Sequence, residues 1–372
     1  MTGEVRYLEP RTDVPAKDDW STGLILQELG LIRLTLSIVA LVSLAGLVGC
    51  LFLPMEMGNI AAIVVLSLLL LIGAIGPVMH RVQTLPLRRG LLDEPWRRCP
   101  VTVVDHPDDK YSTYFRLPDG VVLEILPGGE LRDVLRSRGE VFVCGPNAKG
   151  KAVVRVAGLA ETENAKVASP AEFVDREPEE PLEVGRPLDD PAVLKAFSGL
   201  VMGTHSTLGA TIPAGIGVVI VLMSLWPIAP AGLVVGGLVV VLSLLMLPSL
   251  IELGRWYRDA VRGMHAAHRW IPVPITLFPW KPGALVAGLA TMEGGRLALV
   301  QFVDPNLHII ANIADTGTMW IAGVHEDVIA VGVPGIPVLT IAAIQPDSDT
   351  PREAPVPWIQ RLRQPDFSGL PR

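Results

Sequence analysis

Residues 34–53 read LTLSIVALVSLAGLVGCLFL, a continuous apolar run without a charged side chain. About 20 residues of this kind cross the hydrocarbon core of a bilayer as one helix. Similar runs follow at 60–78, 208–226 and 231–253. We therefore expect four transmembrane helices, because lipid offers the backbone no hydrogen-bonding partner and a helix satisfies its own polar groups.

The connections between the runs are short. Residues 54–59 join the first two runs, and residues 227–230 join the last two. Connections of this length permit only a tight reversal of direction. The sequence thus predicts two transmembrane hairpins.

Composition favours a membrane protein over a nucleic-acid-binding one. Half of the 372 residues are hydrophobic, 19% are charged, and the formal net charge is −7. The basic residues lie beside the apolar runs and form no separate Lys/Arg-rich face for a phosphate backbone. The expected partner is the lipid bilayer, and a cytosolic or membrane protein or a second copy of the chain are further candidates. We expect no nucleic acid.

Arginine near the span ends predicts the orientation. Lys and Arg are retained on the cytoplasmic side of a membrane. Neither hairpin tip carries one, whereas basic side chains follow both hairpins, among them Arg81, Arg88, Arg89, Arg255, Arg258 and Arg262. We expect a multi-pass protein of the cell (plasma) membrane with both termini in the cytosol.

Small residues within the runs mark places where helices could pack closely. These are Gly46, Gly49, Gly73, Gly76, Gly232 and Gly236, of which the last two form a GxxxG pattern. Glycine is also simply common in membrane helices, and that alternative stays open. No ionisable side chain lies near the middle of any run, so a proton or ion relay has no evident carrier.

The segments after the two hairpins resemble each other. Eight residues align in a W-x-x-x-P-x-T pattern and a later glycine: Trp96, Pro100, Thr102 and Gly145 in the first copy, and Trp270, Pro274, Thr276 and Gly323 in the second. Similarity at a nearly constant spacing indicates a duplicated unit. For the two tryptophans, packing at a seam is favoured over stacking on a ligand.

Each copy contains several short strand-like segments separated by Gly- and Pro-rich turns. The first copy predicts strands at 100–105, 112–117, 120–126, 140–144 and 151–157, and the second at 272–279, 284–290, 296–303, 308–313, 318–322 and 328–332. Strands this short and numerous suggest a small barrel of the OB or SH3-like kind in each copy, or one joint sandwich across both. The expected fold class is an α+β membrane protein.

These patterns divide the chain into seven parts. In order they are an N-terminal segment 1–33, hairpin 34–80, β-domain 81–160, acidic linker 161–200, hairpin 201–253, juxtamembrane helix and β-domain 254–344, and a Pro-rich tail 345–372.

Three motifs suggest chemistry but have simpler structural explanations. Residues 145–151 match G-x4-G-K, but Ala152 replaces the Ser or Thr of a P-loop and a strand-like run follows, so we expect a hairpin turn. His265 and His268 could share a helix face without a third metal ligand, which favours an interfacial helix. The acidic segment 105–109 favours a solvated loop. We thus predict no catalytic, cofactor or metal site.

The chain is rich in Arg, Val and Ala and contains the strand patterns W-x-x-x-P-[VI]-T and [FW]-[VI]-[CA]-G. In these features it resembles uncharacterised multi-pass membrane proteins of actinobacteria such as Streptomyces. The resemblance covers most of the chain, and its motifs are structural. The architecture is also similar to that of NfeD-like proteins, which attach a small OB barrel to membrane helices.

A membrane-anchored scaffold or interaction protein with paired cytosolic β-modules is the function we expect first. Duplicated modules, a linker and the lack of catalytic motifs motivate it. A transporter or channel component is the first alternative. A ligand sensor or enzyme that acts through the β-domains is the second.

Overall fold

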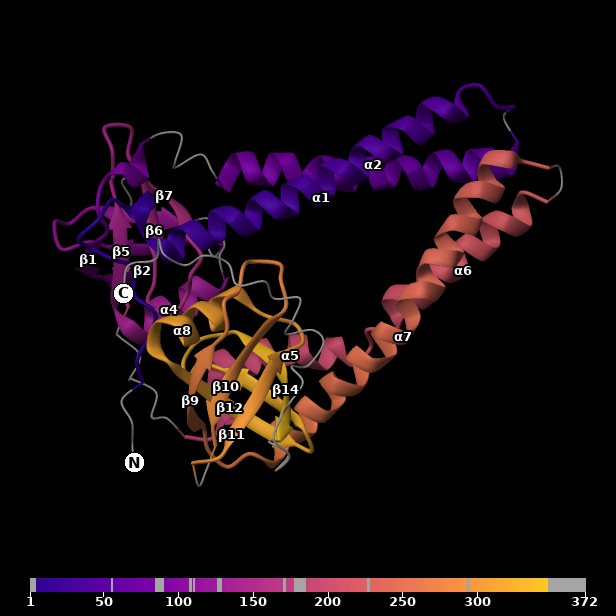
Figure 1. Ribbon diagram of the computed structural model, residues 1–372. Coiled ribbons are helices and arrows are strands. Elements are labelled where there is room, and N and C mark those ends of the chain that lie inside the picture. The colour runs from indigo at the N-terminus through magenta and orange to yellow at the C-terminus, as the bar shows by residue number, and fades with distance from the viewer. Residues whose placement is uncertain are drawn as a thin grey trace. The chain divides into compact units, whose positions relative to one another are not determined.

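The computed structural model describes residues 5–54, 56–83, 90–106, 109, 111–125, 129–169, 172–176, 185–225, 228–292 and 295–346. The chain forms two compact units. Residues 1–24, 94–200 and 259–372 form one, here the β unit, and residues 25–93 and 201–258 form the other, here the helical unit. Figure 1 shows the helices and strands of both.

The helical unit contains the long apolar helices. These are α1 (Trp20–Cys50), α2 (Met57–Gln83), α6 (Leu208–Met223) and α7 (Pro230–Ala266), of which α1 and α7 extend beyond the unit. In the described residues, three helices are long and apolar enough to cross a membrane, namely α1, α2 and α7. A membrane protein is therefore supported.

The third predicted span differs from its expected form. Helix α6 has 16 residues, which rise about 24 Å, less than the roughly 30 Å of a hydrocarbon core. It reaches spanning length only together with α5 (Pro191–Gly203), from which it is bent by 42°. By length and composition, the described residues thus contain three candidate spans, or four if this bent pair counts as one.

Large apolar side chains cover the outside of these helices. Leu41, Leu71 and Leu245 are 68%, 64% and 70% exposed. Each such side chain would cost about 1.5–3 kcal/mol less in an apolar medium than in water. The helical surface is accordingly suited to lipid.

The first β layer of the β unit follows α2 in the chain. Its elements are β1 (Arg97–Pro100), β2 (Thr102–Asp105), β3 (Thr113–Arg116), β4 (Val122–Ile125), α4 (Gly129–Arg138), β5 (Glu140–Cys144), β6 (Lys151–Arg155), β7 (Glu163–Val167) and β8 (Val174–Asp175). The strand order is β1-β5-β6-β7-β4-β3-β2-β8. Because only Val101 separates β1 from β2 in the chain, the sheet curves back on itself.

The second β layer is a closed six-stranded barrel, drawn in orange to yellow in Figure 1. Its elements are β9 (Ile271–Leu277), β10 (Val286–Thr291), β11 (Leu297–Phe302), α8 (Leu307–Thr316), β12 (Thr318–His325), β13 (Val328–Gly332) and β14 (Leu339–Pro346). The order around the barrel is β10-β11-β14-β13-β12-β9. Helix α8 separates β11 from β12, as α4 separates β4 from β5 in the first layer.

The strand predicted at 308–313 is wrong, because these residues belong to α8. The Asn306 side chain accepts hydrogen bonds from the backbone N–H groups of His308 and Ile309 and caps the helix. Gly317 ends it in the left-handed conformation, with φ 65°. The cap and the terminal glycine outweigh the β-branched run Ile309-Ile310.

The segment expected as an acidic linker, 161–200, is largely structured. It contains β7, β8, the 3-10 turn η3 (Pro187–Asp189) and α5. In β7 only Ala165 is buried, so the strand has a polar outer face that composition alone cannot distinguish from a linker. The last strand, β14, likewise runs past 344 to Pro346.

Six strands in the closed barrel exceed the five of an OB fold. The two layers also share one hydrophobic core, which includes Phe115 and Val154 of the first layer and Ile309 and Val331 of the second. The G-x4-G-K segment lies between β5 and β6, which pair antiparallel, so a hairpin connection and a following strand are confirmed there. The Pro-rich tail beyond 346 lies outside the described residues.

Candidate functional site

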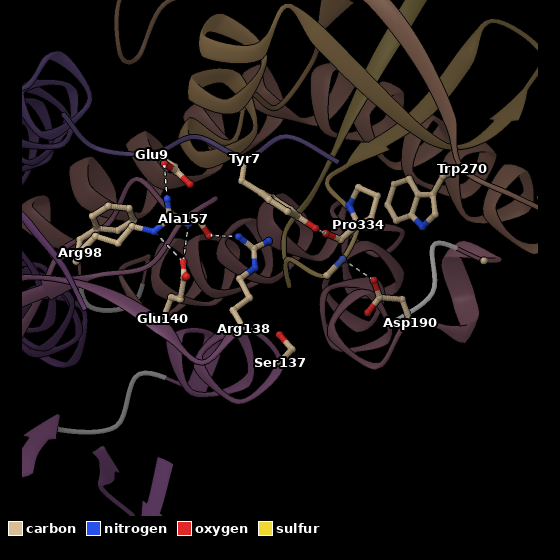
Figure 2. Close-up of a pocket in the computed structure, with 13 residues that line it drawn as sticks. Tyr7, Glu9, Arg98, Ser137, Arg138, Glu140, Ala157, Asp190, Trp270 and Pro334 are labelled. Atoms are coloured by element: carbon tan, nitrogen blue, oxygen red, sulfur yellow. Dashed lines mark hydrogen bonds and ion pairs between the residues drawn. The ribbon is translucent and has the colours of Figure 1, made fainter. Parts of the chain in front are cut away.

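A cavity of about 290 Å³ lies within the β unit. Its polar wall comprises Tyr7, Glu9, Arg98, Arg138, Glu140 and Asp190, and the apolar part includes Phe142 and Trp270 (Figure 2). Small-molecule sites typically occupy about 300–1,000 Å³. The cavity therefore suits a compact ligand with few non-hydrogen atoms.

The wall is assembled from distant parts of the chain. Tyr7 and Glu9 come from the segment before α1, Arg98 from β1, and Arg138 from the end of α4. Asp190 precedes α5, and Pro334 and Gly335 follow β13. The first β layer, the barrel and both pre-helical segments thus meet around one space.

Of the two arginines in this wall, Arg138 is the one that forms no ion pair with a carboxylate of the described residues. Its Nη1 donates to the carbonyl of Ala157 over 2.8 Å, and its guanidinium carbon lies 3.3 Å from the centroid of the Tyr7 ring. Its Nη2 is buried and finds no hydrogen-bond partner in the described part of the chain. Burial lowers the pKa of Arg138.

Arg98, by contrast, is already neutralised. Its Nη2 lies 2.7 Å from Glu140 Oε2, and its Nη1 lies 3.6 Å from Glu9 Oε2. All three side chains are about half exposed, so water weakens these ion pairs. One guanidinium thus lies between two carboxylates, and both carboxylates already have a cationic partner in the chain.

Asp190 is the carboxylate without a cation. It is 8% exposed, its Oδ1 accepts from the backbone N–H of Ala192 over 2.9 Å, and its Oδ2 accepts from that of Gly335 over 2.7 Å. Among the described residues it forms no ion pair. Two backbone donors hold this side chain rigidly at the cavity wall.

Aromatic rings complete the site. The Tyr7 hydroxyl donates to the carbonyl of Pro334 over 3.2 Å, and burial raises its pKa, so the phenol stays protonated at neutral pH. The Trp270 ring lies close to Gly332, where an added methyl group would be 3.1 Å from the indole. In Figure 2 the Tyr7 ring lies between Arg138 and Asp190 in the view shown.

The eight residues aligned between the copies lie in the two β layers and not in one cluster. Trp96 and Trp270 are buried, at 1% and 5% exposure, and only Trp270 lines the cavity. Pro100, Thr102, Pro274 and Thr276 are exposed strand residues. Gly145 has φ +93° after β5, whereas Gly323 lies in β12 against Gly263.

Glycines of the helical unit lie at several helix contacts. A methyl group at Gly73 or Gly76 of α2 would meet Ala40 or Leu36 of α1 at 2.7 or 2.6 Å, and one at Gly46 would meet Leu66 at 3.0 Å. At Gly236 it would meet Gly217 O at 2.8 Å, and at Gly232 it would meet Gly58 O at 2.6 Å. Gly49 has open space around it.

The arginines used for orientation lie on helix ends where the structure describes them. Arg81 is exposed at the end of α2, and Arg255, Arg258 and Arg262 are exposed on α7. Arg262 Nη1 lies 3.1 Å from Asp259 Oδ1. Arg88 and Arg89 lie outside the described residues.

The described residues contain no cluster of three or more His, Cys, Asp or Glu side chains that could hold a metal ion. His265 packs edge-on against Phe197 at 5.3 Å. Asp109 accepts from the backbone N–H of Tyr111 and from the Tyr114 hydroxyl, which stabilises the loop after β2.

Sequence reasoning did not single out Tyr7, Arg138 or Asp190. Asp190 carries one local signal, since an Asp before a helix is a common N-cap. Nothing local marks Tyr7 or Arg138, because their proximity arises only when residues 5–10 pack against both β layers. No family model, no curated protein and no solved structure matches this chain.

Proposed function

We propose that this chain is a membrane-anchored ligand sensor whose β unit binds a small charged organic molecule in the cavity at Tyr7, Arg138 and Asp190. One observation carries the proposal. The cavity wall presents a guanidinium and a carboxylate that have no ion-pair partners among the described residues. Charged groups at a partly buried wall are costly unless they are paired, and a complementary ligand supplies the missing partners.

Internal duplication accounts for the architecture in this proposal. Both β layers have the element order strand, strand, strand, helix, strand, strand, strand, if β1 and β2 count as one interrupted strand and the two-residue edge strand β8 is left aside. Their pairing schemes also agree, since β5-β6-β7-β4-β3 corresponds to β12-β13-β14-β11-β10. Two copies of one module that share a core create an interior seam, which is where the cavity lies.

The helices serve as the anchor. The proposal places the protein in the cell membrane with both termini and the β unit in the cytosol, supported by the exposed arginines at the ends of α2 and α7. Single cysteines at Met57 and Tyr111, which are 60% and 84% exposed, test it in a background without Cys50, Cys99 and Cys144. An impermeant maleimide should label the Met57 variant in intact cells and the Tyr111 variant only after lysis.

The scaffold role and the transporter role stay predictions from the sequence. The scaffold role assigns no function to the cavity, whereas ligand sensing does. No ionisable side chain lies near the middle of the apolar runs, which gives a transport path no evident carrier. Ligand sensing is therefore the function that the geometry favours.

The test is ligand-dependent stabilisation of the full chain in detergent micelles. A panel of amino acids, polyamines, dicarboxylates, sugar phosphates and nucleotides is screened for a rise in melting temperature. A ligand present at 100 times its Kd stabilises the folded state by about 2.7 kcal/mol, which a melting curve detects readily. Absence of any stabilising compound would contradict the proposal.

A matched pair of variants locates the binding. Ser137 lines the cavity, and its Oγ donates to Val134 O in α4. Ser198 makes the equivalent bond to Lys195 O on the exposed side of α5 and does not line the cavity. Ser137→Trp should fill the cavity and abolish the stabilisation, whereas Ser198→Trp should preserve it.

A further inference from the structure

The two β layers can be superposed position by position through their strand pairings. Pro100 pairs with Glu140 in the first layer, and Pro274 pairs with Thr318 in the second. Two residues further along these strands, Phe142 pairs with Arg155 and Trp320 pairs with Gly332. Arg155 and Gly332 therefore occupy equivalent positions.

The turns that follow support the same alignment. Gly158 and Gly335 each lie three residues beyond this pair, and both have positive φ, +88° and +74°. In each turn the next residue donates its N–H to the carbonyl three residues earlier, from Leu159 to Val156 and from Ile336 to Val333. The equivalence thus extends into the loop that forms the cavity wall.

Asp19 and Asp190 are a second equivalent pair. Each follows a 3-10 turn, η1 (Ala16–Asp18) or η3 (Pro187–Asp189), and each precedes a helix, α1 or α5. Their backbone angles agree, with φ −69° and ψ 124° at Asp19 and φ −81° and ψ 114° at Asp190. Each N–H donates to the first residue of its turn over 3.4 Å.

The two carboxylates nevertheless differ in their partners. Asp19 Oδ2 lies 3.2 Å from Arg155 Nη1, and both side chains are fully buried. Among the described residues Asp190 has only the two backbone donors, and Gly332 stands where the first layer has Arg155. In one copy a guanidinium from the chain pairs with the carboxylate before the helix, and in the other copy that carboxylate lines the cavity.

From this difference we propose that the cavity binds a cationic amino acid, with its guanidinium or ammonium group against Asp190 and its carboxylate against Arg138. The inference rests on the proposed function and adds the class of ligand. A bare cation would leave Arg138 without an ion-pair partner, and a bare anion would leave Asp190 without one. A molecule that carries both charges neutralises each wall group, and a guanidinium beside Asp190 reproduces the Asp19–Arg155 pair.

The aromatic groups fit the same ligand. The cation would approach Asp190 beside Trp270 and Tyr7, whose ring faces attract positive charge. The aliphatic part of an arginine- or lysine-like molecule would lie along Phe142 and Trp270. A volume of about 290 Å³ accommodates a molecule of this size.

The experiment compares three closely related probes by calorimetry on the full chain in detergent. L-Arginine carries both charges, L-citrulline replaces the guanidinium with a neutral group of nearly the same shape, and agmatine lacks the carboxylate. We expect L-arginine to bind at least about tenfold more tightly than either, because a charged hydrogen bond is lost in each comparison. Equal affinity for L-arginine and L-citrulline would overturn the inference.

Substitution of Asp190 provides the second test. Asp190→Asn keeps a helix-capping side chain but removes the charge, so L-arginine affinity should fall about tenfold or more and discrimination against L-citrulline should vanish. Asp175→Asn is the matched control, since Asp175 pairs with Arg116 at the exposed edge strand β8. It should leave both affinities unchanged.

The two proposals fail in different ways. If no compound in the wider panel stabilises the protein, ligand sensing itself is wrong. If dicarboxylates or sugar phosphates bind, Ser137→Trp abolishes their binding and L-arginine does not bind, the cavity is a ligand site, and the cationic amino acid is excluded. Binding of L-arginine that survives both Ser137→Trp and Asp190→Asn would also exclude it.

Discussion

Arg155 Nη1 lies 3.2 Å from Asp19 Oδ2 in an environment where neither side chain is exposed. The same guanidinium donates from Nε to Leu159 O over 2.8 Å and from Nη1 to the Ser21 hydroxyl over 2.8 Å. Burial lowers the pKa of Arg155 to about 10, and Asp19 opposes the shift, so the guanidinium stays charged at neutral pH. It joins the segment before α1 to strand β6.

Replacement of Arg155 by methionine should be strongly destabilising. The change leaves Asp19 buried without its cation, which typically costs about 3–5 kcal/mol. The melting temperature of the full chain in detergent should fall markedly. Arg116→Met, which removes an arginine from an exposed pair with Asp175, should cost about 1 kcal/mol or less.

The double variant Arg155→Met with Asp19→Asn separates lost charge pairing from lost packing. If the uncompensated carboxylate dominates the cost, the double variant should be more stable than Arg155→Met alone, because both charges are gone. A double variant as unstable as the sum of the two single changes would contradict a charge-pairing role.

The buried environment of His308 predicts that the folded protein loses stability in mild acid. Its Nδ1 accepts from the backbone N–H of Ala160 over 3.1 Å, and burial, with a smaller effect of Arg155, lowers its pKa to about 4. An unfolded histidine has a pKa of about 6.5. The folded state therefore binds fewer protons between about pH 4 and 6.5, so the free energy of unfolding falls as the pH is lowered through this window.

The effect can be measured as the slope of the melting temperature against pH. The full shift corresponds to about 3 kcal/mol between these two pH values. His308→Asn keeps an acceptor near Ala160 but cannot titrate, so its melting temperature should depend less on pH than that of the wild type. Parallel curves for the two proteins would show that His308 does not carry this dependence.

Much of the fold could be predicted from local sequence, and the candidate site could not. Apolar runs of spanning length and alternating strands give α1, α2, α7 and most of the β segments directly. Helix α8 was missed because Ile309-Ile310 fits a strand unless the cap at Asn306 and the stop at Gly317 are weighed. Strand β7 was missed because only Ala165 of its five residues is buried.

The cavity depends on contacts between residues far apart in sequence. Tyr7 and Pro334 are joined by one hydrogen bond, and Asp190 and Gly335 by another. Such contacts arise from how the two β layers pack and leave no periodicity in the chain. The alignment of Trp96 with Trp270 could be seen in the sequence. Only the structure shows that Trp270, and not Trp96, lines the cavity.

Gly323 should tolerate no side chain. A methyl group there would lie 2.4 Å from the backbone N of Met264 and from the carbonyl carbon of Gly263, so α7 and β12 approach backbone to backbone. Gly323→Ala must push them apart, at a cost of about 1–3 kcal/mol or more. Gly199→Ala in α5, where nothing lies within 4 Å, should be neutral or gain up to about 1 kcal/mol.

Neighbouring glycines of α7 test the helix contact in the helical unit. A methyl group at Gly236 would meet Gly217 O of α6 at 2.8 Å and Val221 at 3.0 Å, whereas Gly237 faces open space. Helices in lipid gain their packing energy from such close approach. Gly236→Leu should therefore separate α6 from α7 and lower the melting temperature in detergent, while Gly237→Leu should leave it nearly unchanged.

The two variants differ by one position and add the same side chain, so hydrophobicity and helix propensity cancel in the comparison. What remains is the face of the helix on which leucine is placed. A similar loss from both would show that glycine acts through backbone flexibility along α7. A loss confined to Gly236→Leu would show that the contact with Gly217 holds the two helices together.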